Sequence, residues 1–161
     1  MTNAGGVGVI GGVGMSPKYL REQIAELKVR SFALDPRRII LYEGRNVQED
    51  LIDKSAPFGI DLLLPAVGGS ARKTNKDYTS GNLNELIDIV IESGAAVFIS
   101  AVGVPPIAVV ERLHKANIVV MNMVGSPKHV PKALAVGVDV IVAQGGEGGG
   151  HTGQYSASSW F

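Results

Sequence analysis

Three aliphatic runs decide the fold of this chain: Val97-Phe98-Ile99-Ser100, Val119-Val120-Met121-Asn122-Met123 and Val140-Ile141-Val142-Ala143-Gln144. Each run is almost continuously apolar, which is typical of a strand buried on both faces of a parallel sheet. Val119 lies 22 residues after Val97, and Val140 lies 21 residues after Val119. Such a short period leaves room only for compact strand–helix units with right-handed crossovers. The runs therefore predict an α/β fold with a parallel sheet.

Two earlier runs extend the predicted sheet toward the N-terminus. Ile60–Leu64 and Val7–Ile10 have the same aliphatic character, which brings the expected strands to five. Near-equal spacing favours a closed (β/α)8 barrel over a doubly wound sheet, although the two folds share the same repeating unit. We therefore expect residues 1–161 to form a single partial TIM-barrel domain with about five of the eight strands.

Amphipathic stretches between the runs predict four helices. Ser16-Pro17 combines an N-cap with a proline at the first helical position. Gly94 is expected to end the second helix in a left-handed conformation, and the fourth helix runs from Ser126-Pro127 to near Gly137. The apolar stripes of the first three helices are Leu20, Ile24 and Leu27; Leu83, Leu86, Ile87, Val90 and Ile91; and Val109, Val110 and Leu113.

Three segments depart from this pattern. Residues 29–49 show no sustained period; they are a possible insertion or gene-model error, within which Ile39–Tyr42 could add a strand. Pro131 would fall about one turn into the fourth helix, at a cost of roughly 3 kcal/mol unless that helix begins later. Residues 154–161 carry no helix or strand signal.

Composition excludes several classes of function. The 15 basic and 15 acidic residues balance, and they do not form a basic stripe, so nucleic acid is not expected as a partner. With no cysteine, the chain has neither disulfides nor thiolate sites. It shows no signal-peptide pattern and no apolar run of the ~18–20 residues that span a bilayer. We expect a cytoplasmic protein that does not bind membranes.

Two glycine tracts are candidates for ligand binding. Gly6–Gly11 matches G-x-G-x-x-G, but too few residues precede it for the strand that a dinucleotide fingerprint requires. The tract from Ala143 to Gly153 is more specific, because it follows a predicted buried strand on the face where barrel enzymes build active sites. Its glycines allow backbone to approach a planar ligand, Gln144 can donate and accept hydrogen bonds, and His151 titrates near neutrality.

The other polar candidates are less specific. His129, in the first turn of a helix, is a possible pocket residue, whereas His114 on an amphipathic helix fits half-exposed packing. No pair of histidines has metal-ligand spacing, so no metal site is expected. The basic loop with Arg72, Lys73 and Lys76 is either a solvated loop or a device that steers an anionic substrate.

Several motifs resemble the nitronate monooxygenases, formerly called 2-nitropropane dioxygenases. The motifs are the stretches 3–12, 56–65, 67–75, 121–125 and 144–153. The last, Gln-Gly-Gly-Glu-Gly-Gly-Gly-His-Thr-Gly, is the most specific. The resemblance implies a TIM barrel that holds FMN at the carboxyl ends of its strands. It also implies oxidation of alkyl nitronates or nitroalkanes by O2 to a carbonyl compound and nitrite.

Site residues follow from the same resemblance. His151 matches the family's catalytic histidine, and Gln144, Gly149 and Gly150 match flavin contacts. Asp61 falls where many relatives have a flavin-contacting asparagine, and this is a departure, because an ionised carboxylate accepts hydrogen bonds but cannot donate them.

The resemblance also implies missing parts and leaves two alternatives. The chain resembles a fragment without the first βα unit and the phosphate-binding C-terminal units, with residues 154–161 as a non-family tail. Impaired activity is therefore expected. The alternatives are an FMN barrel reductase of the enoyl-acyl-carrier-protein reductase type and a non-catalytic truncated product.

Overall fold

One parallel sheet organises the molecule. The computed structural model describes residues 1–29, 56–64, 77–147 and 156–160. The strands are β1 (Gly8–Gly11), β2 (Phe58–Leu63), β3 (Val97–Ala101), β4 (Val119–Val124) and β5 (Val140–Ala143). They pair in parallel in the order β1-β2-β3-β4-β5, the same as their order in the chain. A doubly wound sheet would reverse its strand order at a switch point, so this order is that of a barrel. All five predicted strands are confirmed.

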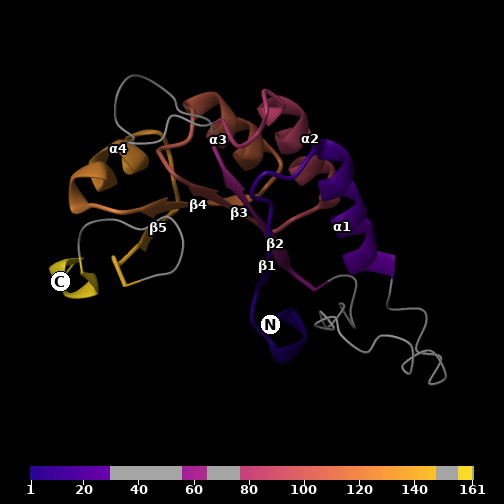
Figure 1. Cartoon of the computed structure of the whole chain (residues 1–161), viewed down its shortest axis with the longest axis horizontal. Coiled ribbons are helices and arrows are strands. Elements are labelled where there is room, and N and C mark those ends of the chain that lie inside the picture. The colour runs from indigo at the N-terminus through magenta and orange to yellow at the C-terminus, as the bar shows by residue number, and fades with distance from the viewer. Residues whose placement is uncertain (30–55, 65–76, 148–155, 161) are drawn as a thin grey trace.

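The helices cover one side of this sheet. The helices are α1 (Pro17–Val29), α2 (Leu83–Ser93), α3 (Ile107–Lys115) and α4 (Val130–Ala135). In Figure 1, α2, α3 and α4 lie above the strands and α1 to their right, whereas the N-terminal turn η1 (Thr2–Ala4) lies below them. The sheet curves around its lower side. The described residues thus form five strands and four helices of a (β/α)8 barrel, with the helices outside and a concave sheet face inside.

The predicted helix boundaries have identifiable causes. Ser16 caps α1, because its Oγ accepts a hydrogen bond from the backbone N–H of Tyr19 at 3.2 Å. Gly94 ends α2 with a φ of +69°, as predicted. A short 3-10 turn, η4 (Pro127–His129), precedes α4. The α-helix proper begins only at Val130, so Pro131 lies in its first turn, where no helical hydrogen bond is lost.

Side chains alternate between two very different environments along the strands. Those that point to the helices form the core; Ile60, Phe98 and Val120 are each 0% exposed. On the opposite, concave face, Val9 is 46% exposed and Val119 41%. The alternation shows that the hydrophobic core of the described residues lies between the sheet and its helices.

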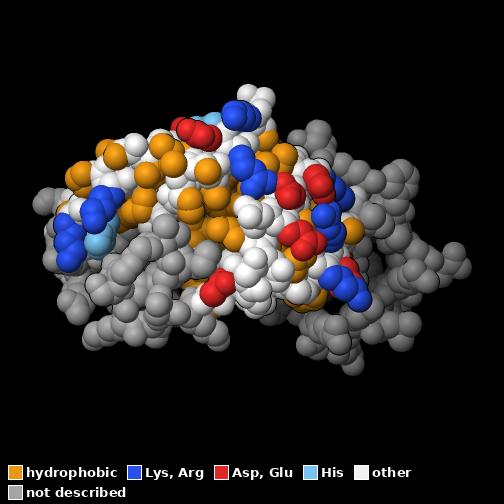
Figure 2. Space-filling view, turned by 90° about the horizontal axis from the view of Figure 1, so that it is seen from above, with side chains coloured by type: hydrophobic (Ala, Val, Ile, Leu, Met, Phe, Trp, Pro, Cys, Tyr) orange, Lys and Arg blue, Asp and Glu red, His pale blue; other side chains and the backbone are white. Residues whose placement is uncertain are grey.

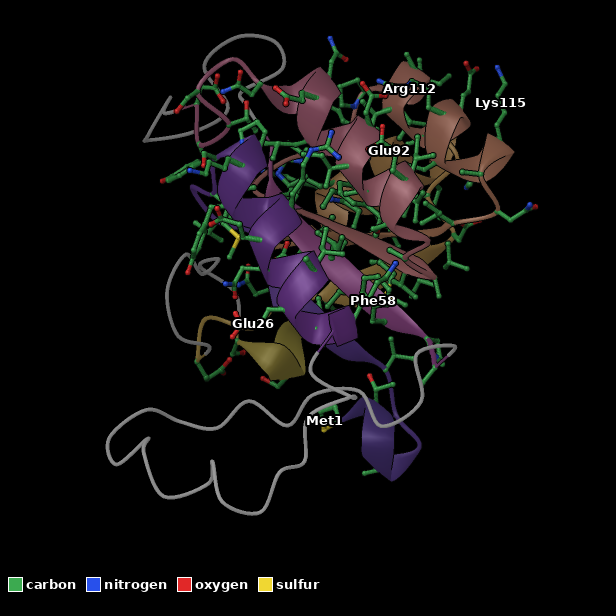
Figure 3. All side chains as sticks on the ribbon, turned by 90° about the vertical axis from the view of Figure 1, so that its right-hand side faces the viewer. Met1, Glu26, Phe58, Glu92, Arg112 and Lys115 are labelled. Carbon is green, nitrogen blue, oxygen red and sulfur yellow. The ribbon has the colours of Figure 1, made fainter. Side chains whose placement is uncertain are left out.

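Polar contacts tie the helices together at the outer surface. In Figure 2, which looks onto the helical side, acidic and basic side chains are interspersed. Arg21 on α1 pairs with Glu92 on α2 at 2.6 Å, and Arg112 on α3 pairs with Asp88 on α2. Figure 3 shows Phe58 beside the end of α1, where Lys28 Nζ lies 5.5 Å from the centre of its ring.

Some sequence predictions lie outside the described ranges. The possible insertion, with its candidate strand Ile39–Tyr42, is among them, and so is the basic loop at positions 72–76. Residues 154–161 had no predicted structure, yet η5 (Ala157–Trp160) forms a 3-10 helix whose Trp160 packs against the core. None of the helices in the described ranges is long and apolar enough to cross a membrane.

Candidate functional site

The carboxyl ends of the strands meet along one edge of the sheet, where barrel enzymes place their active sites. The loops that leave this edge begin at Gly12, Leu64, Val102, Gly125 and Gln144.

Asp61 lies on the concave face within a ring of apolar residues. The strand register places one residue of each strand in this layer: Gly11, Asp61, Ile99, Met121 and Val140. Asp61 is the only ionisable residue in the five strands. Its carboxyl group therefore interrupts a surface that is otherwise apolar.

Burial changes the acidity of Asp61. Its Oδ1 atom is buried and has no hydrogen-bond partner among the described residues. Loss of solvent raises the pKa of Asp61 from 3.8 to about 6, because a carboxylate is poorly solvated there. A buried acceptor without a partner is uncommon in folded proteins and is a reason to look for a ligand.

Two glycines lie beside Asp61. One lets the backbone of the next loop approach β2 closely, and the other leaves the concave face open. The N–H of Gly12 donates to the backbone oxygen of Asp61 at 2.8 Å. A Cβ at position 12 would lie 2.7 Å from the backbone oxygen of Asp61, so glycine is required there. At Gly11, a Cβ would meet nothing within 4 Å. The concave face is therefore open at Gly11, directly beside Asp61.

A buried polar pair holds the loop after β3. The Nδ2 of Asn122 donates to the Gly103 oxygen at 2.8 Å, the Ser100 oxygen at 3.0 Å and Ser100 Oγ at 2.9 Å. Both side chains are 0% exposed and face the helices. The loop contains Val102 with a φ of +63°, which is strained for a β-branched residue. Such strain clusters at functional sites, where surrounding contacts must hold it.

Sequence reasoning missed this pair. The sequence predicts Ser100 and Asn122 as strand residues, with Asn122 also inside the family-like stretch 121–125, and it gives neither of them a polar role. A signal was present, since two polar residues at matching positions of neighbouring buried strands must satisfy each other.

Gln144 follows β5 directly, as predicted. Its backbone N–H donates to the Val124 oxygen at 3.0 Å, and the residue is half-buried. Asp61 on β2 is three strands away, which at ~4.8 Å per strand is on the order of 14 Å along the sheet. The two residues are therefore not in contact; they flank a surface formed by β3 and β4. His151, Gly149 and Gly150 lie outside the described residues.

The other two histidines lie apart from one another. His129 is half-buried at the start of α4, after the carboxyl end of β4. His114 is half-exposed at the end of α3, and its Nε2 lies 2.9 Å from Asp139 Oδ2 near the amino end of β5. Among the described residues, no three His, Asp or Glu side chains come close enough to bind a metal ion.

A groove on the outer surface is a weaker candidate for a ligand site than the concave face. It has a volume of about 320 Å³ and lies between α1 and α2. Its charged residues are already engaged, since Arg21 pairs with Glu92 and Lys28 donates to the Ser93 oxygen.

The fold and the concave polar site define part of an α/β barrel of the kind that binds ligands at its carboxyl end. The sequence profile of the nitronate monooxygenase family matches residues 1–160. The chain belongs to this family.

Curated relatives agree with this assignment. A "Putative monooxygenase" of Mycobacterium tuberculosis is 31% identical over 96% of this chain and 46% of its own length. A "Probable nitronate monooxygenase" of Staphylococcus saprophyticus is 28% identical over 99% of this chain and 44% of its own length. The chain thus spans less than half the length of these relatives.

Solved structures share the fold. FabK from Thermotoga maritima superposes with a TM-score of 0.66 and 23% identity, over 96% of this chain and 38% of FabK. Nitroalkane oxidase from Streptomyces ansochromogenes gives a TM-score of 0.67 and 18% identity, over 98% of this chain and 45% of that protein. The two TM-scores are nearly equal, so the fold resembles FabK and nitroalkane oxidase to the same degree.

Proposed function

We propose that this chain carries the ring-binding side of an FMN-dependent nitronate monooxygenase, which oxidises alkyl nitronates with O2 to a carbonyl compound and nitrite. Family membership supports the reaction class. The observation that carries the proposal is the concave face, where an unpartnered carboxyl oxygen lies beside the open space at Gly11. FMN, when bound, would supply the transfer of electrons from the nitronate to O2.

The proposed roles of the residues follow from their chemistry. Asp61 and Gln144 would hydrogen-bond the polar edge of the flavin ring from opposite sides of β3 and β4. Gly149 and Gly150 would let backbone pack against the ring. His151 would hydrogen-bond the anionic nitro group, or remove the α-proton of a neutral nitroalkane as a general base.

The test separates this reaction from that of an FMN barrel reductase. Purified protein is incubated with FMN, freed of excess flavin and mixed anaerobically with propionate 3-nitronate or with NAD(P)H. We expect the nitronate to bleach the flavin absorbance. Bleaching by NAD(P)H alone would favour the reductase, and protein that retains no flavin would favour a non-catalytic product.

His151 is tested against a matched histidine. We expect His151→Asn to slow nitronate turnover at least tenfold while flavin stays bound, since a positioned acid–base group typically contributes about 10²–10⁴-fold. His114→Asn is the control, because His114 lies near the amino ends of the strands. Equal turnover in the two variants would refute the role of His151.

A further inference from the structure

We propose that Asp61 binds the planar ligand on the concave face in its protonated form, with the carboxyl group donating a hydrogen bond to an acceptor atom of that ligand. Asp61 would thus make ligand binding strongest below neutral pH. The inference rests on the proposed function for the identity of the ligand and adds a regulatory property to the same site.

The surroundings of Asp61 favour a neutral carboxyl group. Among the described strands, the other residues of its layer are Gly11, Ile99, Met121 and Val140. The residue also lies next to Gly12, whose N–H is used by the backbone oxygen and not by the carboxyl group. Without a donor or a cation, a buried carboxylate is destabilised, so the carboxylic acid persists to a higher pH than in water and can serve there as a hydrogen-bond donor.

No charged side chain among the described residues faces Asp61 from a neighbouring element. Strands β1, β3, β4 and β5 contain no ionisable residue. The charges of α1 and α2, including Arg21, Lys28 and Glu92, belong to helices that cover the opposite face of the sheet. Of the loops at the carboxyl edge, the one after β2 contains Asp77, whose carboxylate accepts from Thr79 and Gly81. Lys128 and His129 follow β4, and Glu147 follows β5, whereas Arg72, Lys73, Lys76 and His151 are outside the described ranges.

The unpartnered Oδ1 provides the geometric reason for a ligand. It is buried, whereas Gly11 in the same layer leaves open space. A ligand atom that accepts a hydrogen bond from the protonated carboxyl would fill this space and satisfy the polar group. An ionised Asp61 would repel the same acceptor.

The pH range follows from the acidity of the free protein. With the pKa of Asp61 at about 6, the acid is about nine-tenths protonated at pH 5 and about one-hundredth protonated at pH 8. If only the protonated form binds, the apparent Kd rises by up to about 90-fold between these values.

The experiment measures riboflavin binding by fluorescence quenching at pH 5 and pH 8. Riboflavin is the probe because the phosphate of FMN itself titrates near pH 6. We expect the Kd of the wild-type chain to rise by tens of fold at pH 8. Asp61→Asn should bind at both pH values without this rise, since an amide donates at any pH. Asp61→Leu should bind weakly at both. Asp88→Asn on the outer surface of α2 is the matched control and should behave as the wild type.

The outcomes distinguish this inference from the proposed function. Riboflavin binding by the wild type with no pH dependence, or binding that tightens as pH rises, would overturn the role of Asp61 and leave flavin binding intact. Failure of both the wild type and Asp61→Asn to bind riboflavin or FMN at pH 5 would overturn the proposed function, and the inference with it.

Discussion

The two faces of the sheet each bury a polar side chain, but in different surroundings. On the helical face, Asn122 is fully buried; its amide nitrogen donates to the Ser100 and Gly103 oxygens, and its Oδ1 has no partner among the described residues. On the concave face, the buried Oδ1 of Asp61 also lacks a partner among these residues, but Asp61 lies beside Gly11, where a Cβ would meet nothing within 4 Å. Asn122 is thus enclosed in the core and serves the fold, whereas Asp61 borders open space from which a ligand could reach it. This difference in access is the reason for proposing the binding site on the concave face.

Replacing an apolar residue on the helical face should change the free energy of unfolding most. Phe98 on β3 is 0% exposed on the helical face. We expect Phe98→Ala to lower the free energy of unfolding by about 3–5 kcal/mol, through lost burial and the cavity left behind. Val119→Ala, on the concave face at 41% exposure, should cost less than about 1 kcal/mol. Urea unfolding measures both. Equal losses would mean that the concave face is also a stabilising core.

Asn122 should give the next largest effect. Asn122→Ala removes the donor of the Ser100 and Gly103 oxygens and leaves the buried Ser100 oxygen and the part-buried Gly103 oxygen short of a partner. We expect a loss of about 2–3 kcal/mol that does not change between pH 5 and pH 8, because no group in this network titrates there. The control is Asn84→Ala, whose Oδ1 accepts from Arg112 on the exposed surface. An Asn122 effect no larger than that of Asn84 would contradict a structural role.

Asp61 should behave in the opposite way, with an effect that depends on pH. The fold raises the pKa of Asp61 from 3.8 to about 6, so its neutral form is favoured in the folded state. The contribution of Asp61 to the free energy of unfolding is therefore fully present below pH 3.8 and is lost as pH rises through 6. The difference is worth at most about 3 kcal/mol, and partial solvent access reduces it to on the order of 1–2 kcal/mol.

Thermal unfolding without flavin tests this sign. Asp61→Asn should match the wild type near pH 4 and be more stable at pH 8. A variant that is less stable at pH 8 would show that the ionised carboxylate makes a favourable contact in the fold.

The sequence was sufficient for the fold because its signals are local. Continuous aliphatic runs at a spacing of 21 to 22 residues define the strands, and Ser16 and Gly94 mark helix ends through their own backbone chemistry. The strand order needed only the rule that short crossovers join neighbouring strands. These features depend on few residues at a time.

The site was less accessible from sequence because it depends on contacts between strands. The sequence shows that Asp61 is an acidic residue within an apolar run. Which apolar residues lie beside it in the sheet depends on the register of four other strands, which the sequence does not show. The same holds for Ser100 and Asn122, which are 22 residues apart and bond across β3 and β4. The role of His151 remains a prediction from the glycine tract and the family resemblance.

The substitution of Asp139 should have the smallest effect, and it compares a carboxylate near the amino ends of the strands with Asp61 near their carboxyl ends. Asp139, just before β5, is a partly exposed carboxylate whose Oδ2 accepts from the Val120 N–H at 2.8 Å and lies 2.9 Å from His114 Nε2. Burial acts to raise the pKa of Asp139, but these contacts outweigh it and lower the pKa below 3.8. The contribution of Asp139 to stability is therefore present at neutral pH and is lost as pH falls through the lowered pKa. Asp61 behaves in the reverse way. We expect Asp139→Asn to cost about 0.5–1 kcal/mol at pH 7 and almost nothing near pH 2. Urea unfolding at both pH values measures this, with Glu111→Gln on the exposed side of α3 as the control. A cost that grows as the solution becomes more acidic would mean that the two ends of the sheet do not differ in the way their carboxylates are used.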